Sequence, residues 1–233
     1  MRMGLAVLAV GLLFTGLAQA GEPVKELRVS AIPDENPTEL TRIYASFADY
    51  LTRELNVKVT DISGVDYAAR VEGLAAKKLE MVWYGGFTFV QARKRAGDVV
   101  PLVSREEDLT FHSKFITRSD TNIRTLPDLK GKTFSFGSVS STSGHLMPRY
   151  FLLQQGIDPE RDFAKFSFSR AHDATALWVE SGKVDACALL KLDPNKPEDK
   201  QLLGLHRIKR YVRVEPEDFK PVEEAALAAG LLK

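Results

Sequence analysis

Apolar residues along the chain follow two periodicities, one typical of strands and one typical of helices. Short runs of β-branched and aromatic residues predict strands, and apolar positions spaced three and four residues apart predict helices. In the first half of the chain, strands are predicted over 27–32, 57–62 and 79–83. Helices are predicted over about 40–55, 67–75 and 89–96. Strands that alternate with helices predict βαβ units and a mainly parallel sheet.

The alternation breaks at an extended segment and then resumes. The break lies near residues 112–118, where we expect the chain to cross from one lobe to another. Beyond it, strands are predicted over 133–137, 163–168 and 184–189. Helices are predicted over 145–155, 172–181 and 222–232, with Gly156 and Gly182 as left-handed caps and Ser169 as a possible cap for the second of them.

These elements predict an α/β fold made of two lobes. We expect a first lobe over 21–113, a second lobe over 114–190, and a C-terminal helical segment over 191–233 that packs back on the lobes. About 210 residues beyond the leader described below are enough for two such lobes.

The first 20 residues have the pattern of a secretory signal peptide. Met1-Arg2-Met3-Gly4 precedes an apolar run from Leu5 to Leu17, and Ala18-Gln19-Ala20 matches an A-x-A cleavage site. The run is shorter than the roughly 20 apolar residues that a membrane-spanning helix needs. No cysteine follows it directly, so we expect release into the periplasm without a lipid anchor. An uncleaved N-terminal anchor is the alternative.

The charge balance limits which partners the chain can bind, and the cysteine content limits how the fold can be stabilised. The chain has 32 Lys and Arg against 31 Asp and Glu, so nucleic-acid binding has no electrostatic basis. An anionic ligand would have to be held by local geometry instead. The single cysteine, Cys187, cannot form an internal disulfide, so stability must come from a packed core.

Hydroxyl side chains crowd the link between a predicted strand and a predicted helix, in the stretch Ser138-Val139-Ser140-Ser141-Thr142-Ser143-Gly144-His145. The amino end of a helix carries unpaired N–H groups and a partial positive charge, so these hydroxyls could cradle an oxyanion there. Pro148 supports the placement, because proline is tolerated in the first helical turn. An ordinary serine cap is the alternative.

Tyr84 and His172 occupy comparable places at the ends of other predicted strands. In open α/β sheets, ligands lie outside the carboxyl ends of the strands, so Tyr84 could reach a ligand from the first lobe. The alternative is a buried aromatic pair followed by a glycine turn. His172 could donate to an anion from the start of its helix, although a surface histidine without a function is the alternative.

The sequence argues against an enzyme. Ser143, His172 and Asp173 are the residue types of a hydrolase, yet Ser141 stands where the motif G-x-S-x-G needs its first glycine. His172 and Asp173 are adjacent, so on a helix their side chains would project about 100° apart. The histidines show no zinc-site spacing, and we expect neither a metal nor another cofactor.

Several stretches together resemble the phosphate/phosphite/phosphonate-binding protein family of ABC importers, and most closely its selenate-binding subgroup. They are Ser30-Ala31-Ile32-Pro33-Asp34-Glu35-Asn36-Pro37-Thr38-Glu39-Leu40, Asp66-Tyr67-Ala68-Ala69, Trp83-Tyr84-Gly85-Gly86-Phe87, Phe136-Gly137 with the hydroxyl stretch, and Ala171-His172-Asp173-Ala174. The resemblance implies a type II periplasmic binding protein, in which two lobes joined by crossing strands close over an anion. It also implies that Ser141, Thr142 and Ser143 hold ligand oxygens from the second lobe, that Tyr84 contributes from the first, and that His172 donates from a neighbouring helix.

The resemblance changes after Ala186. Family members usually continue through another helix, a crossing strand and an aromatic, Asp-containing segment. Here Cys187-Ala188-Leu189 runs almost directly into Leu190-Lys191-Leu192-Asp193-Pro194, which is similar to a later part of the family. We therefore expect an internal deletion after about residue 186.

By this resemblance we expect a monomeric periplasmic solute-binding protein that captures a small tetrahedral oxyanion, such as a phosphonate, phosphite or selenate. It would deliver the anion to an ABC transporter permease in the inner membrane. The alternative is a degenerate or regulatory binding protein that no longer transports, because part of the ligand site is deleted.

Overall fold

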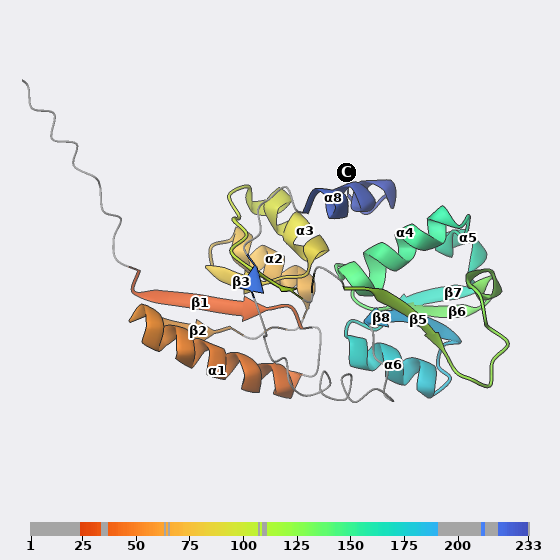
Figure 1. Ribbon diagram of the computed structural model, residues 1–233, viewed down its shortest axis with the longest axis horizontal. Helices are drawn as coiled ribbons and strands as arrows, with labels where there is room; N and C mark the ends of the chain where they lie inside the picture. Colours follow the sequence, from red (N-terminus) through yellow and green to blue (C-terminus); the bar gives the residue numbers. More distant parts are fainter. Residues whose placement is uncertain are drawn as a thin grey trace, which may run out of the picture.

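Two sheets, one from each half of the chain, organise the fold of this protein (Figure 1). The structure is a computed structural model that describes residues 24–33, 37–62, 64, 66–106, 108, 111–190, 211–212 and 219–232. Within these residues, no helix is long and apolar enough to cross a membrane. The predicted signal peptide over 1–20 lies outside them, as does most of the segment after residue 190.

The first lobe is built on a parallel three-stranded sheet in the order β2-β1-β3. Its strands are β1 (Glu26–Ala31), β2 (Lys58–Asp61) and β3 (Met81–Trp83). Its helices are α1 (Pro37–Leu55), α2 (Tyr67–Ala75) and α3 (Gly86–Ala96). Figure 1 shows α1 on one face of the sheet and α2 and α3 on the other. The carboxyl ends of the three strands therefore point to the same edge of this lobe, where they lead into α1, α2 and α3.

The second lobe is built on a four-stranded sheet in the order β5-β8-β6-β7. Its strands are β5 (Ser113–Thr117), β6 (Thr133–Phe136), β7 (Lys165–Phe168) and β8 (Ala186–Leu190). Only β5 is antiparallel to its neighbour. Its helices are α4 (Met147–Gln154), α5 (Pro159–Asp162) and α6 (His172–Glu180), with a short 3-10 helix over Leu126–Leu129. The prediction of mainly parallel sheets is thus confirmed.

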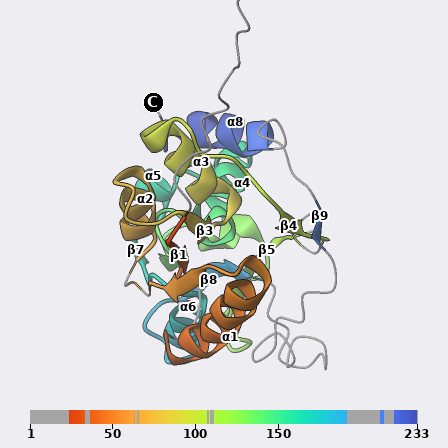
Figure 2. The same cartoon turned by 90° about the vertical axis from the view of Figure 1, so that its left-hand side faces the viewer.

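Two C-terminal elements pack against earlier parts of the chain. The short strands β4 (Ser104–Arg105) and β9 (Tyr211–Val212) pair in an antiparallel manner, and Figure 2 shows them beside each other. Helix α8 (Lys220–Ala228) lies across α3 and α4 (Figure 1). Its Ala226 packs with Phe87 of the first lobe and Leu146 of the second. One apolar cluster is therefore shared by both lobes and by the C-terminal helix.

The core of the second lobe is dominated by phenylalanine. Phe134 and Phe136 from β6 are fully buried and make ring contacts with each other and with aromatic residues of neighbouring segments. Burying one such side chain contributes roughly 1.5–3 kcal/mol. These contacts fix the carboxyl end of β6, from which the hydroxyl-rich stretch departs.

Local details differ from the predictions at two helix starts. The helix expected over 145–155 begins earlier, with one wide π-helical turn over Thr142–Leu146 before α4. Ser169 does not cap α6, which begins after Ala171 without a side-chain cap. The Ser169 hydroxyl instead lies against Thr175 and the carbonyl of Phe136, because β7 delivers it into the buried space beside β6. Gly156 and Gly182 have φ of 70° and 74°, which confirms both left-handed caps.

Candidate functional site

The hydroxyl stretch forms a capped helix start at the carboxyl end of β6. The Ser141 Oγ accepts a hydrogen bond from the N–H of Gly144 at 3.0 Å, as an N-cap side chain does. The N–H of Leu146 bonds to the carbonyl of Ser141 at 3.0 Å, which closes the wide turn. This geometry leaves the amino end of the turn, together with Thr142 and Ser143, beside the end of the strand.

Two glycines allow this turn to lie directly against the strand. The N–H of Gly137 donates to the carbonyl of Gly144 at 2.8 Å, and a Cβ on Gly144 would lie 3.2 Å from the Cα of Gly137. Such a distance is tighter than ordinary van der Waals contact, and the opposing atom is backbone that cannot rotate away. The same Cβ would lie 3.3 Å from the Cε1 of His172. Gly144 therefore lets the strand end, the turn and the start of α6 converge.

Thr142 joins the two lobes. Its Oγ1 accepts a hydrogen bond from the N–H of Phe87 at 2.9 Å, in the first turn of α3. Helix α3 starts after Gly85, which has no side chain to cap it, so Thr142 serves as a cap supplied by the other lobe. Beside it, the hydroxyl of Thr88 donates to the carbonyl of Ser140 at 2.9 Å. The amino ends of α3 and of the Thr142 turn thus meet at the contact between the lobes.

Ser143 and His172 lie in the same neighbourhood on the second lobe, and each is only 6% exposed. His172 is the first residue of α6, and its ring faces Gly144, which follows Ser143 in the π-helical turn. The structure therefore brings together four of the five predicted site residues: Ser141, Thr142, Ser143 and His172.

Tyr84 is turned in another direction. Its hydroxyl donates to the carbonyl of Arg70 at 2.7 Å, so its proton is engaged within the first lobe. Burial raises the pKa of Tyr84 well above its ordinary value, and the phenol stays neutral. In this position its oxygen can accept a hydrogen bond but its proton is not offered to an anion. Its role as a ligand donor stays a prediction.

Arg70 is a polar residue of this region that sequence reasoning missed. It lies in the first turn of α2, is 4% exposed, and its Nε donates to the carbonyl of Ala31 at 3.1 Å. Desolvation lowers the pKa of its guanidinium from the ordinary value. Helical spacing in the sequence could have indicated its burial. Arg70 shares the buried face of α2 with Tyr67, three residues before it, and Val71, one residue after it.

His145 lies in the core of the second lobe. Its Nδ1 lies 2.8 Å from the carbonyl of Val139, and its ring makes edge contacts with Phe136 and Phe168. Burial lowers the pKa of His145 to about 4, so the ring is neutral at physiological pH.

The hydrolase alternative finds no support in the geometry. The Asp173 carboxylate accepts a hydrogen bond from the N–H of Ala174 at 2.7 Å and so serves the start of α6. A catalytic triad needs that carboxylate to orient the histidine ring. Among the described residues, no group of three or more His, Cys, Asp or Glu side chains could hold a metal ion.

Comparison with known proteins places the chain among substrate-binding proteins. Residues 29–201 match the family model described as ABC transporter, phosphonate, periplasmic substrate-binding protein. A probable ABC transporter phosphite-binding protein of Prochlorococcus marinus is 40% identical over 174 residues, covering 72% of this chain and 59% of the relative. A phosphonates-binding periplasmic protein of Escherichia coli is 30% identical over 192 residues, covering 78% and 56%. The chain thus spans somewhat more than half the length of these relatives.

A solved structure agrees with the fold. A Prochlorococcus marinus protein in complex with methylphosphonate superposes with a TM-score of 0.79 at 30% identity, covering 89% of this chain and 99% of that chain. The predicted two-lobe α/β fold is confirmed by this likeness. The predicted deletion after about residue 186 and the predicted lobe boundaries stay predictions.

Proposed function

Because the chain belongs to the family of phosphonate periplasmic substrate-binding proteins of ABC transporters, we propose that it captures a small tetrahedral phosphorus oxyanion, a phosphonate or phosphite. It would work in the periplasm, as a monomer, and pass the anion to a membrane permease. Proteins of this family bind substrates and are not enzymes, in agreement with the sequence analysis.

One observation carries the proposal: the amino ends of two helices, one from each lobe, meet at Thr142. Each end presents backbone N–H groups and a partial positive charge, so a bound anion would interact favourably with both. An anion between them would be favoured only when the lobes are together. Ligand binding and lobe closure are therefore coupled in this proposal.

The donors suit a tetrahedral anion in number and kind. Ser141, Thr142 and Ser143 supply hydroxyls whose protons can point toward different oxygens of the anion, and His172 supplies a ring nitrogen. Hydrogen bonds to a charged group contribute about 1.5–3 kcal/mol each, more than neutral ones. Exclusion of water would strengthen each of them.

The printed names of the relatives support the choice of phosphorus anions. One is named as a phosphite-binding protein, another as phosphonates-binding, and the solved neighbour holds methylphosphonate. The selenate prediction rests on the sequence resemblance alone and is treated as one arm of the experiment.

The test is a titration of the purified chain with methylphosphonate, phosphite, phosphate, selenate and sulfate, followed by calorimetry and thermal unfolding. Ligand at 100 times Kd should stabilise the folded state by about 2.7 kcal/mol and raise Tm by about 5–10 °C. A shift with methylphosphonate or phosphite, and none with matched potassium chloride, is the expected result. A response to selenate alone would contradict binding of a phosphorus oxyanion and identify selenate as the ligand.

The absence of a shift with every anion would contradict capture and favour the degenerate or regulatory alternative. Hydrolysis of a chromogenic phosphate monoester by the same preparation would favour an enzyme instead.

A further inference from the structure

Arg70 holds a buried positive charge in a fixed position. Its Nε donates to the carbonyl of Ala31, and the residue as a whole is 4% exposed. A Cβ on Gly64 would overlap its guanidinium, so a glycine at 64 makes the space that the group occupies. The guanidinium is therefore anchored through its Nε and lies close against the backbone at Gly64.

This charge has no ion-pair partner in the described part of the chain. The ion pairs found there join other arginines and lysines to carboxylates, as Arg28 is joined to Glu80. Asp61 and Asp66 act on Arg70 only as nearby charges and not through a hydrogen bond. A buried guanidinium remains protonated and is costly to leave uncompensated. Its free donors, on Nη1 and Nη2, are therefore available to an anion from outside the chain.

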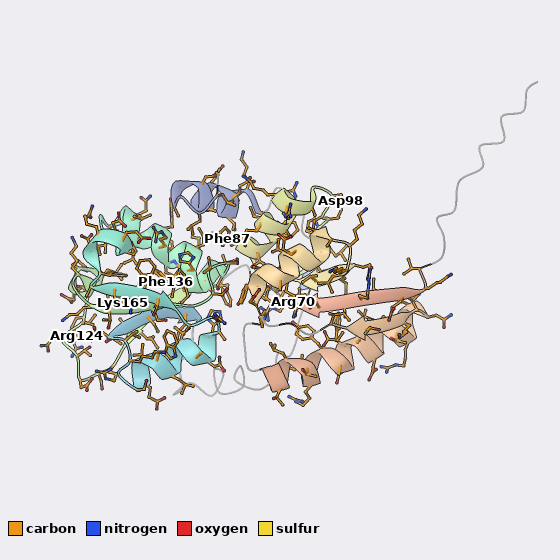
Figure 3. All side chains as sticks on the ribbon, turned by 180° about the vertical axis from the view of Figure 1, so that it is seen from behind. Arg70, Phe87, Asp98, Arg124, Phe136 and Lys165 are labelled. Carbon is orange, nitrogen blue, oxygen red and sulfur yellow. The ribbon has the colours of Figure 1, made fainter. Side chains whose placement is uncertain are left out.

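The guanidinium lies on the edge of the first lobe from which a ligand would be reached. Ala31, its acceptor, ends β1, and the carboxyl ends of parallel strands are where ligands lie in open α/β sheets. Figure 3 shows Arg70 at the tip of β1, on the side of the first lobe that faces the second. Ile32 follows Ala31 and lies within 3.8 Å of a Cβ built on Gly85, which would itself lie 3.2 Å from the Oγ1 of Thr142.

We propose that Arg70 is a specificity-determining ligand residue whose guanidinium selects doubly charged tetrahedral oxyanions over singly charged ones of the same shape. The inference rests on the proposed function and adds to it a charge criterion. Hydroxyls and N–H groups recognise oxygens of either kind of anion, whereas a fixed cation gains more from the second negative charge. Methylphosphonate above its second ionisation is favoured, and methanesulfonate, which has the same shape and one charge, is not.

The experiment compares Kd for methylphosphonate and methanesulfonate in the wild-type chain, Arg70→Gln, Arg70→Lys and Arg28→Gln. The wild type should prefer the phosphonate. Arg70→Gln should weaken phosphonate binding by about 10- to 100-fold and sulfonate binding by much less. Arg70→Lys should recover part of the loss. Arg28→Gln removes an equal charge from β1 and should leave both constants within about twofold.

A second variant moves the guanidinium without removing it. Gly64→Ala places a methyl group where the head of Arg70 lies, so it should reduce phosphonate affinity and leave the charge of the protein unchanged. Urea unfolding of the ligand-free variants gives a further readout. Arg70→Gln should be at least as stable as the wild type, because it removes a buried charge that nearby carboxylates offset only in part and that no ion pair holds.

Equal loss of both ligands in Arg70→Gln, or unchanged phosphonate affinity, would overturn the inference while leaving the proposed function intact. Lower stability of the ligand-free Arg70→Gln with unchanged selectivity would assign Arg70 a structural role. A wild-type chain that binds neither anion would instead contradict the proposed function itself.

Discussion

Replacing Thr142 with valine keeps the shape of the side chain and removes the oxygen that accepts from the N–H of Phe87 at 2.9 Å. In the ligand-free protein, the first turn of α3 then loses its cap from the other lobe. Loss of a helix cap costs about 0.5–2 kcal/mol. Thr142 is only partly buried, so water can replace part of the lost bond, and we expect a decrease of about 1 kcal/mol in the free energy of unfolding.

The effect of Thr142→Val on ligand binding should be larger. A hydroxyl bonded to a charged oxygen contributes about 1.5–3 kcal/mol, which corresponds to roughly a 10- to 100-fold loss of affinity for methylphosphonate. Urea unfolding measures the first quantity and calorimetry measures the second. The two readouts together separate a capping role from a binding role.

Thr133→Val is the matched control for this prediction. In the wild type, the Thr133 hydroxyl donates to the Asp185 carboxylate at 2.7 Å, within the second lobe and at the amino end of β6. This variant should lose stability and retain its affinity. Unchanged affinity in Thr142→Val, or an equal loss of affinity in both variants, would refute the assignment of the site to the contact between the lobes.

Three further predictions concern single positions. Gly85→Ala should lower phosphonate affinity without backbone strain, because its Cβ would lie 3.2 Å from the Oγ1 of Thr142 and its φ is −81°. Calorimetry on this variant checks the expectation, and Gly131→Ala is the control: its Cβ meets nothing within 4 Å but its φ is 73°, so it should lose stability and keep its affinity. Burial lowers the pKa of His145 to about 4 whereas unfolded histidine titrates near 6.5, so unfolding takes up a proton between those pH values. The free energy of unfolding should therefore fall by about 1.4 kcal/mol per pH unit as pH drops through that range, and a pH series in which His145→Asn keeps the same slope would contradict this. Burial raises the pKa of Cys187 to about 12, so a thiol reagent should label it only on unfolding, and rapid labelling of the native protein would show otherwise.

The sequence determined the local features of the site region. Hydroxyl residues, Gly144 and Pro148 lie within a few positions of one another, so the cap at Ser141 and the start of a helix follow from short-range chemistry. Hydrophobic periodicity placed most strands and helices for the same reason. It did not foresee the wide π-helical turn, because that turn depends on close packing against Gly137.

Only the tertiary structure decided which distant groups meet. Thr142 lies 55 residues from Phe87 and Arg70 lies 39 residues from Ala31, so no local pattern predicts either hydrogen bond. The sequence also left the direction of the Tyr84 hydroxyl undetermined, because the same tyrosine could face a ligand or the carbonyl of Arg70 in α2. Periodicity says that Arg70 lies on a buried helix face. Packing of that face against the end of β1 turns the buried charge into a candidate anion donor.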